Sequence, residues 1–220
     1  MKRLVVICEG HTEKEFCQTI LYPFLLRNRI VVEAPLIKKS MGGIVGWESL
    51  RQQIRTTLIN DPTAIVTTFI DYYGLKESHS FPSWDDAHKK VDLNDRMDIL
   101  ENGMLNNLSD AFQHRFIPYI QLHEFEGLLF IDYRFFDEQF ESSEIQNTRD
   151  FKRIFKKFPN PELINNGSTT APSKRLMNHI VGYNKIVYGN MIADAIGLKN
   201  IMDKCPRFNT WLTKIIQLGK

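Results

Sequence analysis

Acidic residues stand where several short apolar runs of this sequence end. Glu9 and Asp71 each follow such a run directly, and Glu124 and Glu126 come just after another. Because the carboxyl ends of parallel strands meet at one edge of a sheet, we expect these carboxylates to gather there. Neighbouring carboxylates repel one another unless a cation lies between them, and hard oxygen ligands suit Mg²⁺ or Mn²⁺. We therefore predict a metal site made by Glu9, Asp71 and Glu126, with Glu124 as a weaker choice for the third ligand.

The alternative for any single one of these acids is a solvated carboxylate beside a helix N-terminus, where the helix dipole favours negative charge. His11 and His123 each adjoin a motif acid, and imidazole titrates near neutral pH. Either histidine can therefore serve as a proton relay or a metal ligand, and His123 is the better choice. The structural alternative is a hydrogen-bonded histidine at the end of a strand.

Strands and helices alternate along the first half of the chain, which predicts an α/β fold. Apolar, β-prone runs predict buried strands at 4–8, 30–37, 64–70 and 116–122. A helix is expected after the first strand, capped by Thr12 with Glu15 completing a capping box. Further helices are expected from Trp47 and from Asp92 or Asn94 to about Phe112, with a polar surface loop at 74–92 between them.

Beyond residue 135 the pattern becomes mainly helical. We therefore expect a mainly parallel sheet flanked by helices at 1–135, and a helical C-terminal extension at 136–220 packed on that core. Gly42, Gly43 and Gly46 suggest a phosphate-cradling loop, but the lysine and hydroxyl residue of a nucleotide-binding P-loop are missing, so no ATP site is expected.

Composition excludes several classes of protein. Lys and Arg total 28 against 26 Asp and Glu, so the net charge of +2 gives no field that identifies a polyanion partner. No apolar stretch reaches the roughly 18 residues that span a membrane, so we expect no membrane partner and a cytoplasmic location. The three cysteines form no CxxC pair, which argues against a thiolate zinc site.

The segment VVICEGHTEKEF resembles the opening motif of TOPRIM domains, the catalytic module of topoisomerases, bacterial primases and OLD-type nucleases. The successive blocks EGHTEKEF, FIDYYGL, HEFEGLLF, APSKR and GYNKIVYGNMIADAIGL with CPRFNTWL resemble one TOPRIM-like family over nearly the whole chain. That family is related to RloB-type and OLD-type nuclease modules, which occur beside ATPases in prokaryotic defence systems. The resemblance thus implies a TOPRIM-like, Rossmann-like sheet and a partner ATPase.

The resemblance also implies roles for single residues. Glu9 matches the TOPRIM glutamate that acts as a metal ligand or general acid/base, and Glu13 matches the second acid of the OLD-like variant. Asp71 matches the first aspartate of the metal-binding DxD motif, but Tyr73 stands where the second should be. Lys174, in the APSKR block, corresponds to a lysine that stabilises charge on the scissile phosphate; an ordinary surface lysine is the alternative, and Lys185 lies nearby in the sequence.

Two functions follow from these expectations. The first is a metal-dependent phosphodiesterase, a nuclease acting on DNA or RNA with Mg²⁺ or Mn²⁺, in which Glu9 or Glu13 handles the proton. The second, motivated by Tyr73 and by the absence of a strongly basic face, is a catalytically degenerate subunit that binds and regulates an ATPase partner.

Overall fold

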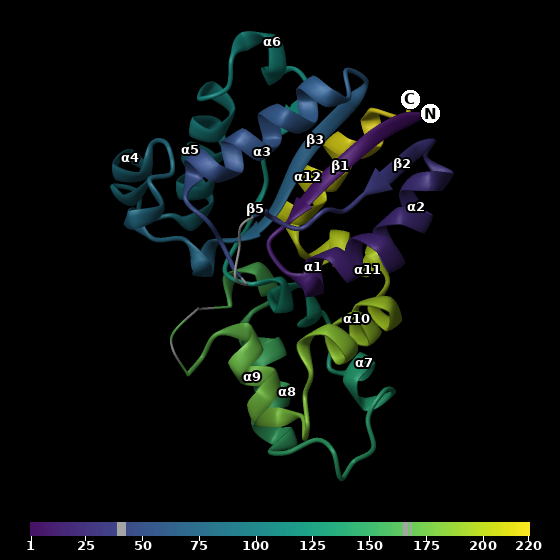
Figure 1. Cartoon of the computed structure of the whole chain (residues 1–220). Coiled ribbons are helices and arrows are strands. Elements are labelled where there is room, and N and C mark those ends of the chain that lie inside the picture. Colours follow the sequence, from purple (N-terminus) through teal and green to yellow (C-terminus); the bar gives the residue numbers. More distant parts are fainter. Residues whose placement is uncertain (39–42, 165–166, 168) are drawn as a thin grey trace. The chain divides into compact units, whose positions relative to one another are not determined.

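The computed structural model describes residues 1–38, 43–164, 167 and 169–220 (Figure 1). The chain forms two compact units, of which the first comprises Met1–Ile120 and Trp211–Lys220 and the second Gln121–Thr210. The chain passes from one unit to the other within strand β5 (Ile120–Gln121) and again within helix α12 (Pro206–Gln217). The expected division into 1–135 and 136–220 differs from this one in two respects: the first unit ends at Ile120, and the chain returns to it at Trp211.

The first unit is built on a mainly parallel sheet, as the sequence predicts. Strands β1 (Lys2–Cys8), β2 (Ile30–Glu33), β3 (Ala64–Asp71) and β4 (Phe116–Ile117) lie in the order β2-β1-β3-β4, and β5 pairs with β3. The recorded pairings of β1 with β2 and β3, and of β3 with β4, are parallel. The carboxyl ends of the central pair, β1 and β3, therefore lie side by side, and the α/β fold class is confirmed.

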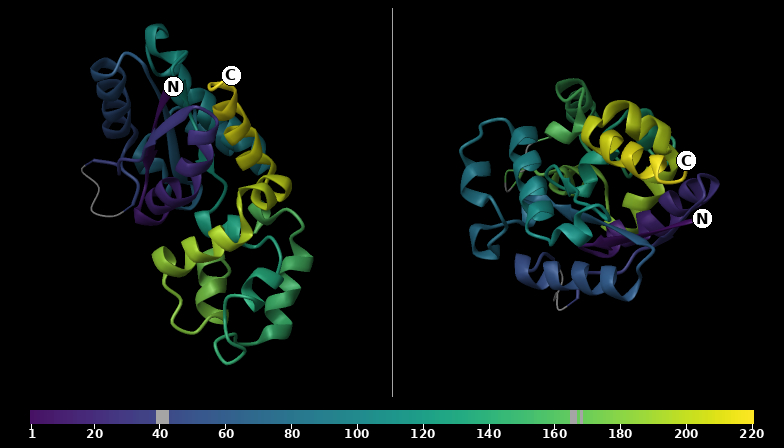
Figure 2. Two further views of the ribbon diagram at one scale, coloured as in Figure 1. Left: turned by 90° about the vertical axis from the view of Figure 1, so that its right-hand side faces the viewer. Right: turned by 90° about the horizontal axis from the view of Figure 1, so that it is seen from above.

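Helices cover the sheet. The described helices of this unit are α1 (His11–Phe16), a π-helical turn (Cys17–Leu21), α2 (Tyr22–Arg27), α3 (Trp47–Asn60), α4 (Trp84–His88), α5 (Leu93–Asn106) and α6 (Asp110–Gln113). Helix α3 and the C-terminal part of α12 lie on opposite faces of the sheet (Figure 2). Trp211 of α12 packs on Phe69 of β3 and stacks on Tyr119, so residues at the end of the chain complete the core.

Several local predictions need correction. Gly10, not Thr12, is the residue before α1, and Glu13 rather than Glu15 reaches back to it. The segment 74–92 contains α4 and a 3-10 turn (Glu77–His79) in addition to loop. Asp92 caps α5 as expected, accepting the backbone N–H groups of Asn94 and Asp95, but the helix ends at Asn106 and a separate α6 follows. Gly42 lies outside the described residues.

The expected strand at 116–122 is interrupted at Pro118, which has no N–H to give to a sheet. The side chain of Thr68 replaces the missing sheet bonds. Its Oγ1 donates to the Tyr119 carbonyl at 2.9 Å and accepts the Tyr119 N–H at 2.9 Å. The neighbouring Thr67 Oγ1 accepts the indole N–H of Trp211 at 2.9 Å. Two threonines inside a buried strand are therefore hydrogen-bonding parts of the core.

Replacing Thr68 with the isosteric Val is expected to destabilise the protein by about 2 kcal/mol, because both backbone groups of buried Tyr119 lose that partner. Urea unfolding of purified variants measures the change. Thr68→Ser keeps the hydroxyl and serves as the control. A Thr68→Val protein as stable as Thr68→Ser would contradict this role for the hydroxyl.

The second unit is mainly helical, as predicted for the C-terminal part of the chain. Its described helices are a 3-10 helix (Phe125–Leu129), α7 (Arg134–Asp137), α8 (Thr148–Lys157), a 3-10 turn (Pro161–Leu163), α9 (Pro172–His179), α10 (Lys185–Ile196), α11 (Leu198–Lys204) and the first residues of α12. Buried Glu162 accepts the backbone N–H groups of Arg207 and Phe208 and so caps α12. No helix in the described part of the chain combines the length and apolar character of a membrane span.

Candidate functional site at the carboxyl edge of the sheet

Glu9 and Asp71 lie at the carboxyl ends of the neighbouring strands β1 and β3. Glu9 Oε2 accepts the backbone N–H of Asp71 at 3.0 Å, and the Glu9 N–H donates to the Phe69 carbonyl at 3.1 Å. Both acidic residues are half-buried. One hydrogen bond therefore holds the Glu9 carboxylate beside the residue that carries the second carboxylate.

The turn after β1 fixes the direction of Glu9. The carboxylate of buried Glu13 accepts the Gly10 N–H at 2.8 Å, which ties the first turn of α1 back to the strand end. A Cβ atom added to Gly74 would lie 3.1 Å from Glu9 Oε1, and one added to Gly43 would lie 3.9 Å from it. The second Glu9 oxygen thus faces two glycines, which leave room beside it that larger residues would fill.

Tyr72 and Tyr73 follow Asp71 in a short 3-10 turn. The Tyr72 hydroxyl accepts from Arg96 Nη1 at 2.8 Å and lies 3.2 Å from His88 Nε2, so Tyr72 attaches this turn to α4 and α5. Tyr73, which occupies the position of the expected second aspartate, is 44% exposed. Neither tyrosine supplies a carboxylate to this edge.

Glu124 and Glu126 belong to the second unit, where they form a buried polar cluster. Glu124 accepts the N–H and the hydroxyl of Ser173, both at 3.0 Å. Lys185 Nζ lies 3.2 Å from Glu126 Oε1 and 3.8 Å from Glu124 Oε1, and its side chain is 41% exposed. One cation at the start of α10 thus serves two nearly buried carboxylates.

Burial sets the protonation chemistry of this cluster. Desolvation raises the pKa of Glu126, which the charge of Lys185 partly offsets. The pKa of Tyr183 also rises, mainly through burial and then through the charges of Glu126 and Glu124. The buried Tyr183 hydroxyl makes no hydrogen bond within the described part of the protein. Burial therefore disfavours the charged form of Glu126, and Lys185 is its charged partner.

His123 precedes this cluster in an unusual backbone conformation. Its φ of 68° lies in the left-handed region that non-glycine residues rarely adopt. The imidazole is buried, and burial lowers the pKa of His123 from 6.5 to about 4. Its Nδ1 atom has no hydrogen-bond partner among the described residues. His123 therefore carries a neutral imidazole on an unusual backbone, close in sequence to Glu124 and Glu126. His11, in contrast, is exposed at the start of α1.

The sequence-predicted site residues thus fall into two groups. Glu9, Glu13 and Asp71 lie together in the first unit, whereas Glu126 lies in the second with Lys185. Lys174 is exposed in α9, next to the Ser173 that binds Glu124. Within residues 1–38, 43–164, 167 and 169–220, no group of three or more His, Cys, Asp or Glu side chains is arranged to hold a metal ion.

Sequence reasoning gave no role to Ser173 or Tyr183. Both occur in the sequence blocks that carry the family resemblance, Ser173 in APSKR and Tyr183 in GYNK. These two blocks meet the HEFEGLLF block within the second unit, since Ser173 binds Glu124 and Lys185 pairs with Glu126. The family resemblance that these blocks carry was the sequence signal that grouped them.

Fold and site define an α/β protein with paired carboxylates at the carboxyl edge of a parallel sheet. Comparison with protein families places the chain more closely. The model of the family described as "Domain of unknown function (DUF4276)" matches residues 8–216, and the chain belongs to that family. Comparison with curated proteins found no match, and comparison with solved structures found none.

Proposed function

We propose that this protein is a metal-dependent phosphodiesterase, a nuclease with a TOPRIM-like site that acts on DNA or RNA together with an ATPase partner. The observation that supports it best is the hydrogen bond from the Asp71 N–H to the Glu9 carboxylate. That bond keeps two acidic residues together at the edge of a parallel sheet where α/β proteins bind ligands.

The residues at this edge suit a hard divalent cation. Mg²⁺ typically takes one or two protein carboxylates and keeps the rest of its coordination for water and substrate phosphates. Glu9 and Asp71 would supply the carboxylates, and Gly74 and Gly43 place no side chain against Glu9 Oε1. When bound, such an ion polarises the phosphate and lowers the pKa of an attacking water.

The chain's own residues divide the remaining tasks. Half-buried Glu9 is the acid that a substrate can reach, so we assign the proton transfer to Glu9. Glu13 is buried and bound to the Gly10 N–H, so we assign it the task of holding the turn that aims Glu9. Glu126 and Lys185 are a second acid and cation whose chemistry suits proton exchange or phosphate binding.

Metal binding tests the proposal directly. Calorimetry with Mn²⁺ is expected to detect binding to the wild type, and Asp71→Asn is expected to weaken it by at least about tenfold, because an amide oxygen is a neutral ligand. Asp85→Asn removes an exposed acid from the same unit and serves as the control. Equal Mn²⁺ affinity of wild type and Asp71→Asn would remove Asp71 from the site and count against the proposal.

A second function is favoured by Tyr73. An exposed aromatic side chain at the place of a metal-binding aspartate suits a protein contact better than a metal. On this reading the chain is a regulatory subunit for an ATPase, and its complex with that partner is indifferent to Glu9→Gln and Asp71→Asn but weakened by Tyr73→Ala. Pull-down of the ATPase by these three variants separates the two functions.

A further inference from the structure

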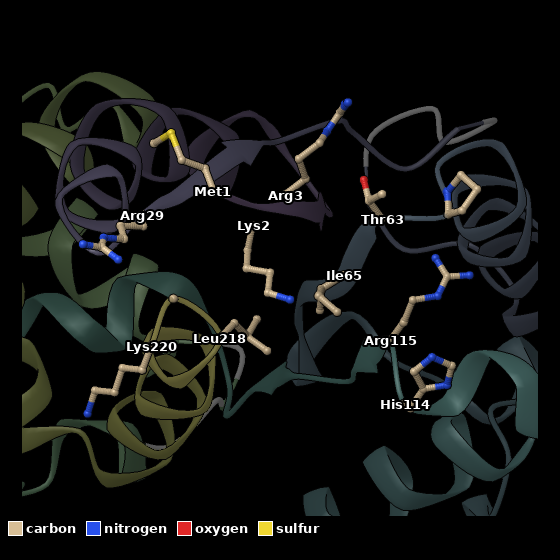
Figure 3. A pocket seen from close by; sticks show the side chains of 12 residues that line it. Met1, Lys2, Arg3, Arg29, Thr63, Ile65, His114, Arg115, Leu218 and Lys220 are labelled. Carbon is tan, nitrogen blue, oxygen red and sulfur yellow. The ribbon is translucent and has the colours of Figure 1, made fainter.

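A cavity of about 900 Å³ lies in the first unit at the opposite, amino ends of the strands. Its lining residues include Lys2 at the start of β1, Arg29 just before β2, Thr63 just before β3 and Arg115 just before β4 (Figure 3). We call it the amino-end cavity. Strand β1 has seven residues, and at about 3.3 Å per residue the cavity is separated from Glu9 by roughly 20 Å.

The amino-end cavity is strongly basic. Five of its twelve lining residues are Lys or Arg and none is acidic, whereas Lys and Arg make up 28 of the 220 residues of the chain. Figure 3 shows the Lys2 side chain in the middle, near Ile65 and Leu218, with Arg29 and Lys220 toward one side and His114 and Arg115 toward the other. Positive charge thus surrounds a small apolar surface.

The Lys and Arg side chains of the cavity differ in the ion pairs and hydrogen bonds that they make within the protein. Arg3 is paired with Glu33 and Asp61, so its charge is largely compensated. The guanidinium of Arg115 donates to three backbone carbonyls, including that of Leu58 at 2.9 Å, which fixes its position without neutralising its charge. For the side chains of Lys2 and Arg29 the described part of the structure records no hydrogen bond or ion pair. These two cations are available to an anion.

The walls of the cavity are held in place by close packing. Arg29 has a φ of 61°, a strained conformation for a residue with a side chain. The segment after α12 approaches it closely, because a Cβ added to Gly219 would lie 1.9 Å from the Asn28 carbonyl oxygen. Only glycine permits this approach, which places Leu218 and Lys220 beside the turn that carries Arg29. The cavity is therefore preformed.

We propose that the amino-end cavity binds a phosphorylated nucleotide, either free or as the end of a nucleic-acid strand. Its volume lies in the range of ligand pockets, about 300–1,000 Å³. Lys2, Arg29 and Arg115 supply charge for phosphate groups, and Ile65 and Leu218 supply an apolar surface for the nucleoside. This site is independent of a metal at Glu9 and Asp71.

Binding is tested with two probes, ADP by calorimetry and a short single strand with a 5′-phosphate by fluorescence anisotropy. The wild type is expected to bind at least one of them, with affinity that falls between about 50 and 200 mM salt. The double variant Lys2→Gln/Arg29→Gln is expected to weaken binding by at least about tenfold, since hydrogen bonds to charged groups are lost. It should also show a shallower salt dependence.

The matched control is Arg55→Gln/Lys90→Gln, which lowers the net charge equally at two exposed residues of the same unit outside the cavity. The control is expected to change affinity by no more than about twofold. If the cavity variant loses binding of ADP but not of the strand, the site is assigned to a free nucleotide. If it loses binding of the strand but not of ADP, the site is assigned to a strand end. Failure of the wild type to bind either probe, or equal weakening by both double variants, overturns the proposal.

The same assays on Glu9→Gln keep this proposal separate from the nuclease. Glu9→Gln is expected to leave binding in the amino-end cavity unchanged, because the substitution lies at the other edge of the sheet. If Glu9→Gln abolished ADP or strand binding in the folded protein, the ligand would occupy the carboxyl edge, and the assignment to the amino-end cavity would be wrong.

Discussion

Glu9→Gln is expected to lower metal-dependent cleavage of nucleic acid by at least about a hundredfold, the scale on which a positioned acid or base contributes. Glutamine retains an oxygen that can accept the Asp71 N–H, so the strand end keeps its geometry. The substitution removes only the negative charge and the capacity to take a proton. Cleavage of single- and double-stranded DNA and RNA, with Mn²⁺ and with EDTA, measures the effect.

Two neighbouring acids provide controls for this experiment. Glu15→Gln, two residues after Glu13 in the same helix, is expected to leave cleavage unchanged. The carboxylate that accepts the Gly10 N–H is that of Glu13, not that of Glu15. Glu13→Gln is expected to cause a smaller loss than Glu9→Gln, since the amide can still accept the Gly10 N–H. If Glu13→Gln were as inactive as Glu9→Gln while its metal affinity stayed normal, Glu13 rather than Glu9 would be the proton acceptor.

The central sheet could be predicted because its signals are local. Apolar, β-prone runs mark β1 and β3, and an acid at the end of each run is delivered to the same edge by any parallel arrangement. The sequence therefore places Glu9 and Asp71 together without any knowledge of helix packing. It does not show that the Glu9 carboxylate accepts the Asp71 N–H, because that bond depends on the geometry of the turns after both strands.

The features that sequence reasoning missed depend on contacts between distant residues. Thr12 and Gly10 are both acceptable residues at a helix start, and the choice is made by the reach of the Glu13 carboxylate to the Gly10 N–H. Residues 211–220 look like part of a helical tail, but Trp211 fills the core beside Phe69 and donates to Thr67. Helical periodicity identifies an apolar face without identifying its partner.

Lys174 and Lys185 show the same limit within the second unit. The resemblance favours Lys174 because of its sequence block, yet it is Lys185 that lies 3.2 Å from Glu126. Lys174 projects from α9 as an exposed residue, whereas the residue before it binds Glu124. Spacing along the chain identifies a segment of a site more readily than the single side chain that points into it.

The second large effect is expected from pH and His123. Burial lowers the pKa of His123 to about 4, whereas the unfolded chain binds a proton near pH 6.5. The contribution of neutral His123 to stability is therefore fully present above pH 6.5 and is lost as the pH falls toward 4. Since one pKa unit corresponds to about 1.4 kcal/mol, the loss reaches about 2.5 kcal/mol at pH 4.5.

His123→Asn is the variant that isolates this contribution. Asparagine adopts a positive φ more readily than other non-glycine residues, so it suits the backbone angle of 68° at this position, and it does not titrate. The unfolding free energy of His123→Asn minus that of the wild type is expected to become more positive as the pH is lowered from 7 to 4.5. Exposed His11 provides the control, since His11→Asn should leave the pH dependence of the wild type unchanged.

Proton NMR of the imidazole groups gives an independent measure of the same titration. One histidine resonance of the wild type is expected to titrate near pH 4 and to be absent from His123→Asn. A resonance of His123 that titrates near pH 6.5 would mean that water or a charged group reaches the buried ring. In that case the unfolding free energies of wild type and variant would depend on pH in the same way, and His123 would make no pH-dependent contribution to stability.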